Sequence, residues 1–80
     1  MFSEEKLKSV MAAVLSIPTE SITAESSKDN VPGWDSLKHM NLILALEEQF
    51  GVTIPDEEAA DLTSYPLIKL VIQELVEAEN

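Results

Sequence analysis

Hydrophobic residues recur at helical spacing in three long stretches of the chain, and no stretch shows the alternation typical of a β-strand. The first stretch predicts a helix from about Ser3 to Ser16. Ser3 is a suitable N-cap, and Pro18 disfavours a helical backbone at Ile17, which ends the helix. The apolar stripe of this helix consists of Leu7, Val10, Met11, Val14 and Leu15.

The second stretch predicts a helix from Ser36 to about Phe50, with Asp35 as its N-cap and Gly51 just past its end. At about 100° per residue, its apolar side chains divide into two arcs on nearly opposite sides. The arc expected to face the core consists of Leu42, Ile43, Leu46 and Phe50. The other arc consists of Leu37, Met40 and Leu44, flanked by Asn41, Glu47 and Glu48.

After this helix, we expect Asp56 to cap a short acidic helix with the sequence EEAADL. Thr63 or Ser64 is expected to cap the last helix, whose first turn accommodates Pro66. The main apolar stripe predicted for the last helix consists of Leu67, Leu70, Val71, Glu74, Leu75 and Ala78, and Ile68, Ile72 and Val76 widen it.

Residues 18–35 form a long connection in which the sequence PTESI predicts a single turn. Ile22 and Val31 are its candidate apolar anchors. Together, these elements predict an all-α fold, a small four-helix bundle of three main helices and one short helix with a long first loop. The 80 residues are enough for one domain, spanning 1–80, and the start at Met1 with the polar end EAEN favours a free-standing one.

The charge of the chain narrows its possible partners. Fifteen acidic and five basic residues give a formal net charge of −10, and such a surface repels nucleic acid and anionic membranes. It favours a partner with a basic patch, although acidic residues also serve solubility alone. No segment reaches the roughly 20 apolar residues of a membrane span, so we expect a cytoplasmic protein, and a monomer.

Catalysis and metal binding have little support in the sequence. Asp35, Ser36 and His39 suggest a triad, but His39 falls about 60° around the helix from Ser36, in the core arc. His39 is better explained as a partly buried residue hydrogen-bonded to the loop. Without cysteine, the chain has no thiolate ligand or nucleophile, and its acidic clusters lack the spacing of a calcium loop. We therefore expect neither an enzyme nor a metal site.

Ser36 has two interpretations. It either only helps to start the helix, a role that Asp35 already fills, or it is a modification site. A group attached to a hydroxyl in the first turn would place a phosphate beside free N–H groups and the positive end of the helix dipole. The long loop before Ser36 leaves it accessible.

The segment that begins at Gly33, GWDSLKHMNLILALEEQFGVTIPDEEAADL, resembles the acyl carrier proteins. Their mark is Asp-Ser-Leu at the start of the second helix, here Asp35, Ser36 and Leu37. The resemblance implies that Ser36 receives 4′-phosphopantetheine from coenzyme A through a phosphopantetheinyl transferase. It also implies that the terminal thiol carries acyl groups as thioesters, and that acyl-loading and acyl-transferring enzymes with basic patches read the second helix.

Two surfaces follow as expectations. The partner-binding residues are Leu37, Met40, Asn41, Leu44, Glu47, Glu48 and Asp56. A site for short or medium acyl chains between the second and third helices is expected to be lined by Leu46, Ile54, Ala59, Ala60 and Leu62.

Some positions depart from the family pattern. Trp34 precedes Asp-Ser-Leu where a small residue is usual, and Lys38 and Asn41 stand where acids are common. These departures favour a specialised carrier, for a polyketide, a modified lipid or an activated amino acid, over a housekeeping fatty-acid carrier. Trp34 either packs beside the attachment site or caps the end of the bundle. The alternative function is a non-covalent helical adaptor that binds basic partners through the second helix.

Overall fold

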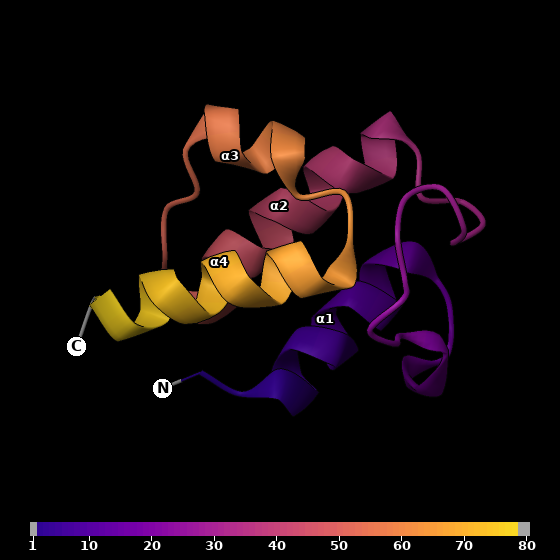
Figure 1. Cartoon of the computed structure of the whole chain (residues 1–80), viewed down its shortest axis with the longest axis horizontal. Helices are drawn as coiled ribbons and strands as arrows, with labels where there is room; N and C mark the ends of the chain where they lie inside the picture. The colour runs from indigo at the N-terminus through magenta and orange to yellow at the C-terminus, as the bar shows by residue number, and fades with distance from the viewer. Residues whose placement is uncertain (1, 79–80) are drawn as a thin grey trace.

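The computed structural model describes residues 2–78, which form a small all-α bundle, as the sequence predicts (Figure 1). Its helices are α1 (Glu4–Leu15), a single 3₁₀ turn η1 (Thr19–Ser21), α2 (Ser36–Phe50), α3 (Asp56–Asp61) and α4 (Tyr65–Ala78). Helices α1, α2 and α4 enclose the core, and the short α3 lies over one side of it. Over the described residues, none of the helices has the length and apolar character needed to cross a bilayer.

Local sequence signals set most helix ends. The Ser3 hydroxyl accepts a hydrogen bond from the backbone N–H of Lys6 at 3.2 Å, and Asp35 Oδ1 accepts one from Lys38 N–H at 2.8 Å. Gly51 follows α2 with a left-handed φ of 64°, a conformation that costs glycine little. The predicted ends of α2 are therefore confirmed.

Helix α1 ends where the sequence predicts but for a different reason, and the cap of α3 differs from the prediction. Helix α1 is terminated before Pro18, because Ser16 adopts the left-handed conformation with φ 59° and its N–H bonds to the Ala12 carbonyl. Asp56 was expected to cap α3, but it is the first residue of that helix, and Pro55 occupies the cap position without a side-chain hydrogen bond. The carboxylates of α3 therefore act through the helix dipole rather than as caps.

The buried face of α4 is shifted by one position from the expected stripe. Tyr65, Ile68, Ile72 and Val76 are the buried residues, whereas Leu67 and Leu70 are 44% and 55% exposed. Apolar residues nearly surround this helix, so periodicity alone could not rank the two overlapping stripes. Packing against α1 and α2 decides between them.

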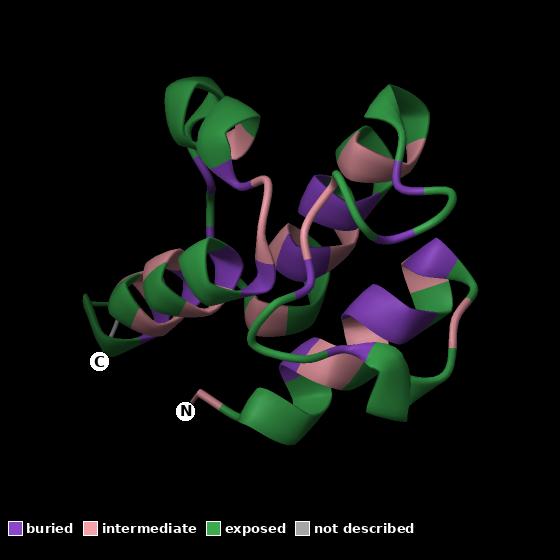
Figure 2. Ribbon diagram, turned by 45° about the vertical axis from the view of Figure 1, so that its right-hand side comes forward, coloured by how far each residue is buried: buried purple, intermediate pink, exposed green. Residues whose placement is uncertain are grey.

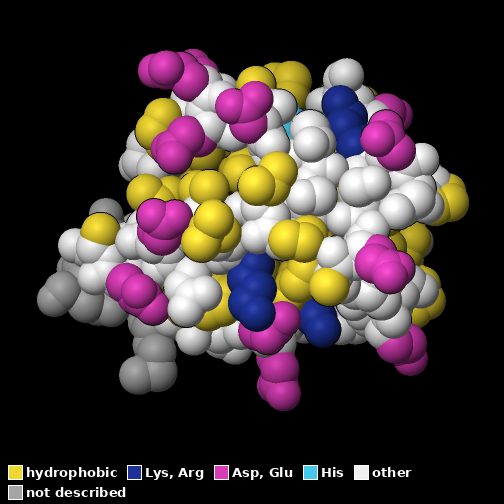
Figure 3. Space-filling view, in the orientation of Figure 1, with side chains coloured by type: hydrophobic (Ala, Val, Ile, Leu, Met, Phe, Trp, Pro, Cys, Tyr) yellow, Lys and Arg dark blue, Asp and Glu magenta, His cyan; other side chains and the backbone are white. Residues whose placement is uncertain are grey.

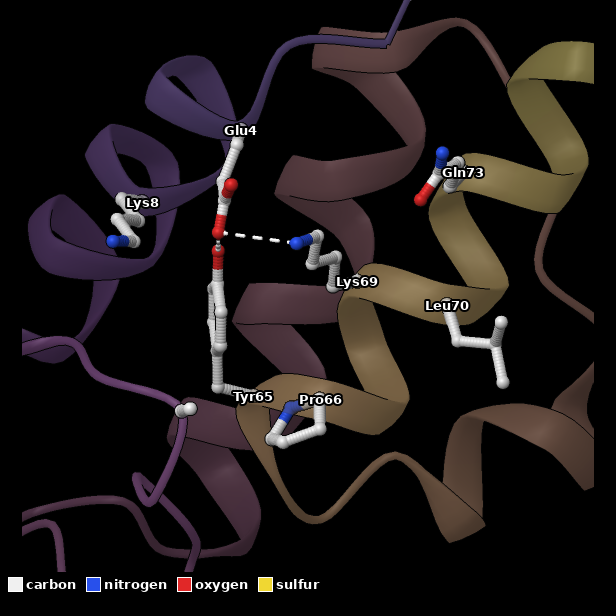
Figure 4. Close-up of a pocket in the computed structure, with 8 residues that line it drawn as sticks. Glu4, Lys8, Tyr65, Pro66, Lys69, Leu70 and Gln73 are labelled. Atoms are coloured by element: carbon white, nitrogen blue, oxygen red, sulfur yellow. Dashed lines mark hydrogen bonds and ion pairs between the residues drawn. The ribbon is translucent and has the colours of Figure 1, made fainter.

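A polar cluster joins α1 to α4 across the bundle (Figure 4). The Tyr65 hydroxyl donates a hydrogen bond to Glu4 Oε2 at 2.6 Å, and Lys69 Nζ lies 3.4 Å from the same oxygen. The hydrogen bond from Tyr65, more than the nearby lysines, lowers the pKa of the Glu4 carboxyl. Burial and the same bond raise the pKa of the Tyr65 hydroxyl. The cluster lines a groove of about 510 Å³.

The long first loop is fixed to the bundle and brings the chain to the start of α2. Ile22 and Val31 are buried and act as anchors, as expected. The loop also pairs with the segment before α4: Lys28 N–H donates to the Thr63 carbonyl, and Tyr65 N–H donates to the Ser26 carbonyl, both at 2.8 Å. The position of Ser36 is therefore set by a tethered loop.

Candidate functional site at the start of α2

Ser36 is the first residue of α2 and its side chain is exposed. The capping position is taken by Asp35, so the Ser36 hydroxyl is not needed to start the helix. The N–H groups of Ser36 and Leu37 lie in the first turn, where no preceding turn supplies acceptors, and they add to the positive end of the helix dipole. The hydroxyl is therefore accessible and lies beside a surface that favours an anion.

Trp34 and His39, which lie on either side of Ser36 in the chain, form a hydrogen-bonded pair. Trp34 is only 4% exposed, and its ring stacks on that of His39 with the centroids 6.2 Å apart. Trp34 Nε1–H donates to His39 Nδ1 at 3.1 Å, and His39 Nε2 lies 2.7 Å from the carbonyl oxygen of Ala59 in α3. The expectation that His39 is partly buried and bonded to the loop is confirmed, and the second bond to α3 is new.

This arrangement does not prepare Ser36 for catalysis. Both ring nitrogens of His39 are engaged by Trp34 and Ala59, so neither is available to accept a proton from the Ser36 hydroxyl. Within residues 2–78, no three acidic or histidine side chains are grouped in a way that could hold a metal ion. The geometry around Ser36 suits attachment of a group to the hydroxyl.

The second apolar arc of α2 faces solvent. Leu37, Met40 and Leu44 are 68%, 65% and 62% exposed, while the opposite arc of Leu42, Ile43 and Leu46 is buried and Phe50 is half-buried. The division into two arcs is thus confirmed. Leu37 belongs both to this arc and to the turn that carries Ser36.

Acidic side chains surround the arc, and many of them gather over α3, at the top of Figure 3. Asn41, Glu48 and Asp56 are exposed, as a partner surface requires. Glu47 differs from them, because its Oε2 accepts a hydrogen bond of 2.7 Å from the backbone N–H of Ile54 and its side chain is half-buried. Glu47 therefore holds the segment before α3 in addition to contributing negative charge.

A hollow of about 310 Å³ lies between α2 and α3. It is lined by His39, Met40, Ile43, Leu44, Glu47, Ile54, Asp56, Ala59 and Ala60. Three of the five residues expected to shelter an acyl chain, Ile54, Ala59 and Ala60, are in this lining. Leu46 and Leu62 are instead fully buried in the core and do not line the hollow.

Two comparisons with known proteins agree with this geometry. Residues 5–66 match the family described as "Phosphopantetheine attachment site". The chain is also 48% identical, over 58 residues, to an acyl carrier protein of Thermosynechococcus vestitus, an alignment covering 72% of each chain. The chain belongs to the acyl carrier protein family. Members of this family are carriers and not catalysts, and membership implies a covalently attached 4′-phosphopantetheine.

The residues at the start of α2 fit such a group. A phosphodiester on the Ser36 oxygen would lie beside the N–H groups of the first turn, and the basic residue Lys38 follows two positions later in the chain. Because Ser36 and Leu37 are both exposed, an attached arm is free to extend into solvent or along α2 toward the hollow.

The sequence did not reveal two contacts of this site. The bond from His39 to Ala59 spans 20 residues, and the bond from Glu47 to Ile54 joins a helix to the loop that follows it. The only indication in the sequence was that His39 lies in the core arc, where its polar ring needs hydrogen-bond partners. Neither partner could be named before the position of α3 was known.

Proposed function

We propose that Ser36 is the attachment residue, and that the protein carries acyl or aminoacyl groups as thioesters of its 4′-phosphopantetheine thiol to partner enzymes. The observation that supports this most directly is an exposed hydroxyl in the first turn of a long helix whose cap is already supplied by Asp35. The attached group supplies the thiol that this chain, with no cysteine, lacks.

Attachment proceeds by transfer from coenzyme A on a phosphopantetheinyl transferase. A new bond forms between Ser36 Oγ and the phosphorus nearest the pantetheine, the pyrophosphate bond breaks, and adenosine 3′,5′-bisphosphate leaves. The hydroxyl proton passes to a base of the transferase. The contribution of this chain is to present the oxygen in solvent beside the positive end of α2.

Partner enzymes are proposed to bind the exposed arc of α2 through Leu37, Met40 and Leu44, with charge contributed by Glu47, Glu48 and Asp56. Apolar side chains rimmed by carboxylates suit a partner that offers an apolar pocket within a basic patch. Asn41 lies within the same surface and adds a neutral polar contact. Such association should be fast at low salt and slow down as salt is added.

The pathway is proposed to be a specialised one that handles a polyketide, a modified lipid or an activated amino acid, in the cytoplasm, with the carrier acting as a monomer. The support is chemical: Lys38 and Asn41 make the first two turns of α2 less negative than the rest of the acidic face. A partner matched to this helix needs fewer basic side chains near Ser36 than one matched to a fully acidic helix.

The attachment site can be tested with the apo-protein, coenzyme A and a phosphopantetheinyl transferase of broad specificity, read by intact mass. Wild type should gain the mass of one phosphopantetheinyl group, and Ser36→Ala should gain none. Ser9→Ala, which removes another exposed helical hydroxyl, is the matched control and should be modified like wild type. Modification of Ser36→Ala to the wild-type extent would refute the assignment.

A further inference from the structure

Helix α3 is held to the bundle by its flanking residues and by few contacts of its own. None of its residues is buried, whereas Ile54 before it and Leu62 after it are 4% and 2% exposed. The helix itself spans six residues, too few to be stable without tertiary contacts. Its position over α2 therefore depends on the hydrogen bonds that side chains of α2 make with it and with the segment before it.

His39 supplies one such contact, and its chemistry is fixed by its two partners. The Ala59 carbonyl can only accept a hydrogen bond, so His39 Nε2 carries the proton. Trp34 Nε1–H can only donate, so His39 Nδ1 is the acceptor. The neutral tautomer protonated at Nε2 satisfies both bonds, and buried Trp34 thereby orients the ring that holds α3.

Glu47 supplies the second contact, with the segment that leads into α3. Its carboxylate accepts the Ile54 N–H at 2.7 Å, just before Pro55 and the start of α3. His39 and Glu47 are eight residues apart on α2, a rise of about 12 Å along the helix axis. Both side chains line the hollow, and the apolar side chains of Met40, Ile43 and Leu44 lie between them in sequence.

We propose that His39 and Glu47 determine which acyl chains this carrier shelters, with Trp34 as a positioning residue that acts through His39. His39 fastens α3 itself to α2, and Glu47 fastens the segment that leads into α3, so that together they limit how far the walls of the hollow can separate. The inference rests on the proposed function, because the acyl chain would enter the hollow from an arm on Ser36. Enlarging the hollow requires α3 to move, which breaks one of these bonds.

The tethers should affect short and long acyl chains in opposite ways. A chain that fits the closed hollow is shielded better when both bonds are present. A chain too long for the closed hollow is shielded better when a bond is removed, because α3 can then move outward. A variant that merely destabilised the bundle would expose the thioester for every chain length.

The first measurement uses the unmodified protein and does not depend on any attached group. In His39→Phe, which keeps an aromatic ring beside Trp34, the amide hydrogens of residues 59–62 should exchange roughly threefold to tenfold faster than in wild type, the factor that one net hydrogen bond is worth. His39→Gln retains a donor near the position of Nε2 and should restore much of the protection.

The second measurement loads the protein with acyl-pantetheine of increasing chain length and follows thioester cleavage by hydroxylamine. His39→Phe and Glu47→Met, which has no acceptor for the Ile54 N–H, should cleave short chains faster and long chains more slowly than wild type, by roughly threefold to tenfold in each direction. Trp34→Phe should show the same pattern with smaller changes. Glu57→Gln removes one exposed carboxylate of α3 that is not in the lining of the hollow, and should match wild type.

The outcomes separate the two proposals. If wild type cannot be loaded at Ser36, the proposed function fails. If wild type is loaded but its chain-length profile is unchanged in both His39→Phe and Glu47→Met, the tether inference fails while the carrier function stands. A uniform increase in cleavage at all lengths would also overturn it, and if His39→Phe does not fold, Glu47→Met decides.

Discussion

Helices α3 and α4 are neighbours in the sequence but are attached to the bundle by different means. Helix α4 buries Tyr65, Ile68, Ile72 and Val76, whereas α3 buries no residue of its own and is exposed over most of its surface (Figure 2). The polar bonds differ in the same way: the cluster of Tyr65 and Glu4 adds to a packed interface, while the bond from His39 to Ala59 lies at the edge of a hollow.

This difference assigns the two helices different tasks. An element held by buried apolar area separates only when the whole domain unfolds, and an element held by a few hydrogen bonds can open by itself. Helix α4 therefore serves as the fixed support. In the tether proposal, α3 is the element that moves to admit an acyl chain, and it is bonded to α2, whose first residue is Ser36.

The largest effect on stability should come from shortening a buried side chain of α4. Ile72→Ala should lower the free energy of unfolding by about 2–5 kcal/mol, because the side chain is fully buried and leaves a cavity. Ala60→Gly, in exposed α3, should lower it by less than about 1 kcal/mol. Urea denaturation measures both. Equal losses would show that α3 is as much part of the cooperative unit as α4.

A smaller effect should distinguish an exposed apolar residue of α2 from an exposed apolar residue of α4. Met40 on α2 and Leu70 on α4 are 65% and 55% exposed, so replacing either by alanine should change stability little. Met40→Ala should reduce kcat/KM for modification by a phosphopantetheinyl transferase by roughly threefold to tenfold, since it removes a contact of the proposed partner surface. Leu70→Ala should leave the rate unchanged, and an equal loss in both variants would contradict a partner surface limited to α2 and the start of α3.

The smallest effect concerns the polar cluster between α1 and α4. Because the bond from Tyr65 lowers the pKa of Glu4 in the folded state, Glu4 contributes stability above the pKa of an unfolded glutamate, about 4.3. That contribution is lost as the pH falls through the folded pKa. The stability difference between wild type and Glu4→Gln, measured by thermal denaturation, should therefore shrink as the pH falls from about 5 to below about 4.3. A stability difference that stays constant over this range would mean that the cluster stabilises the charged and the neutral form of Glu4 equally.

The bounds of α2 and its two arcs were predictable because they depend on local rules. Asp35 and Gly51 mark its ends, and the angle between successive residues separates Leu42 from Met40 whatever the neighbours are. The same rules failed on α4, where apolar residues nearly surround the helix. There, the burial of Ile68 and the exposure of Leu67 depend on which side α1 and α2 occupy.

The sequence predicted the candidate attachment residue, but it did not predict the hydrogen-bond partners of His39. Ser36 was identified from its position at a helix start together with the family motif, and its exposure agrees with that prediction. For His39, the sequence indicated that hydrogen-bond partners were needed, but Ala59 as the partner depends on where α3 lies.

The sequence by itself determined the helices, the acidic charge, the lack of a thiol and the serine most suited to carry one, because these follow from local propensities and composition. The tertiary structure decided which face of α4 is buried, how His39 reaches α3 and Glu47 the segment before it, and where a hollow is left between α2 and α3. Those features arise from contacts between segments far apart in the chain. The hydrophobic periodicity within one segment contains no information about the distance between two segments in the fold.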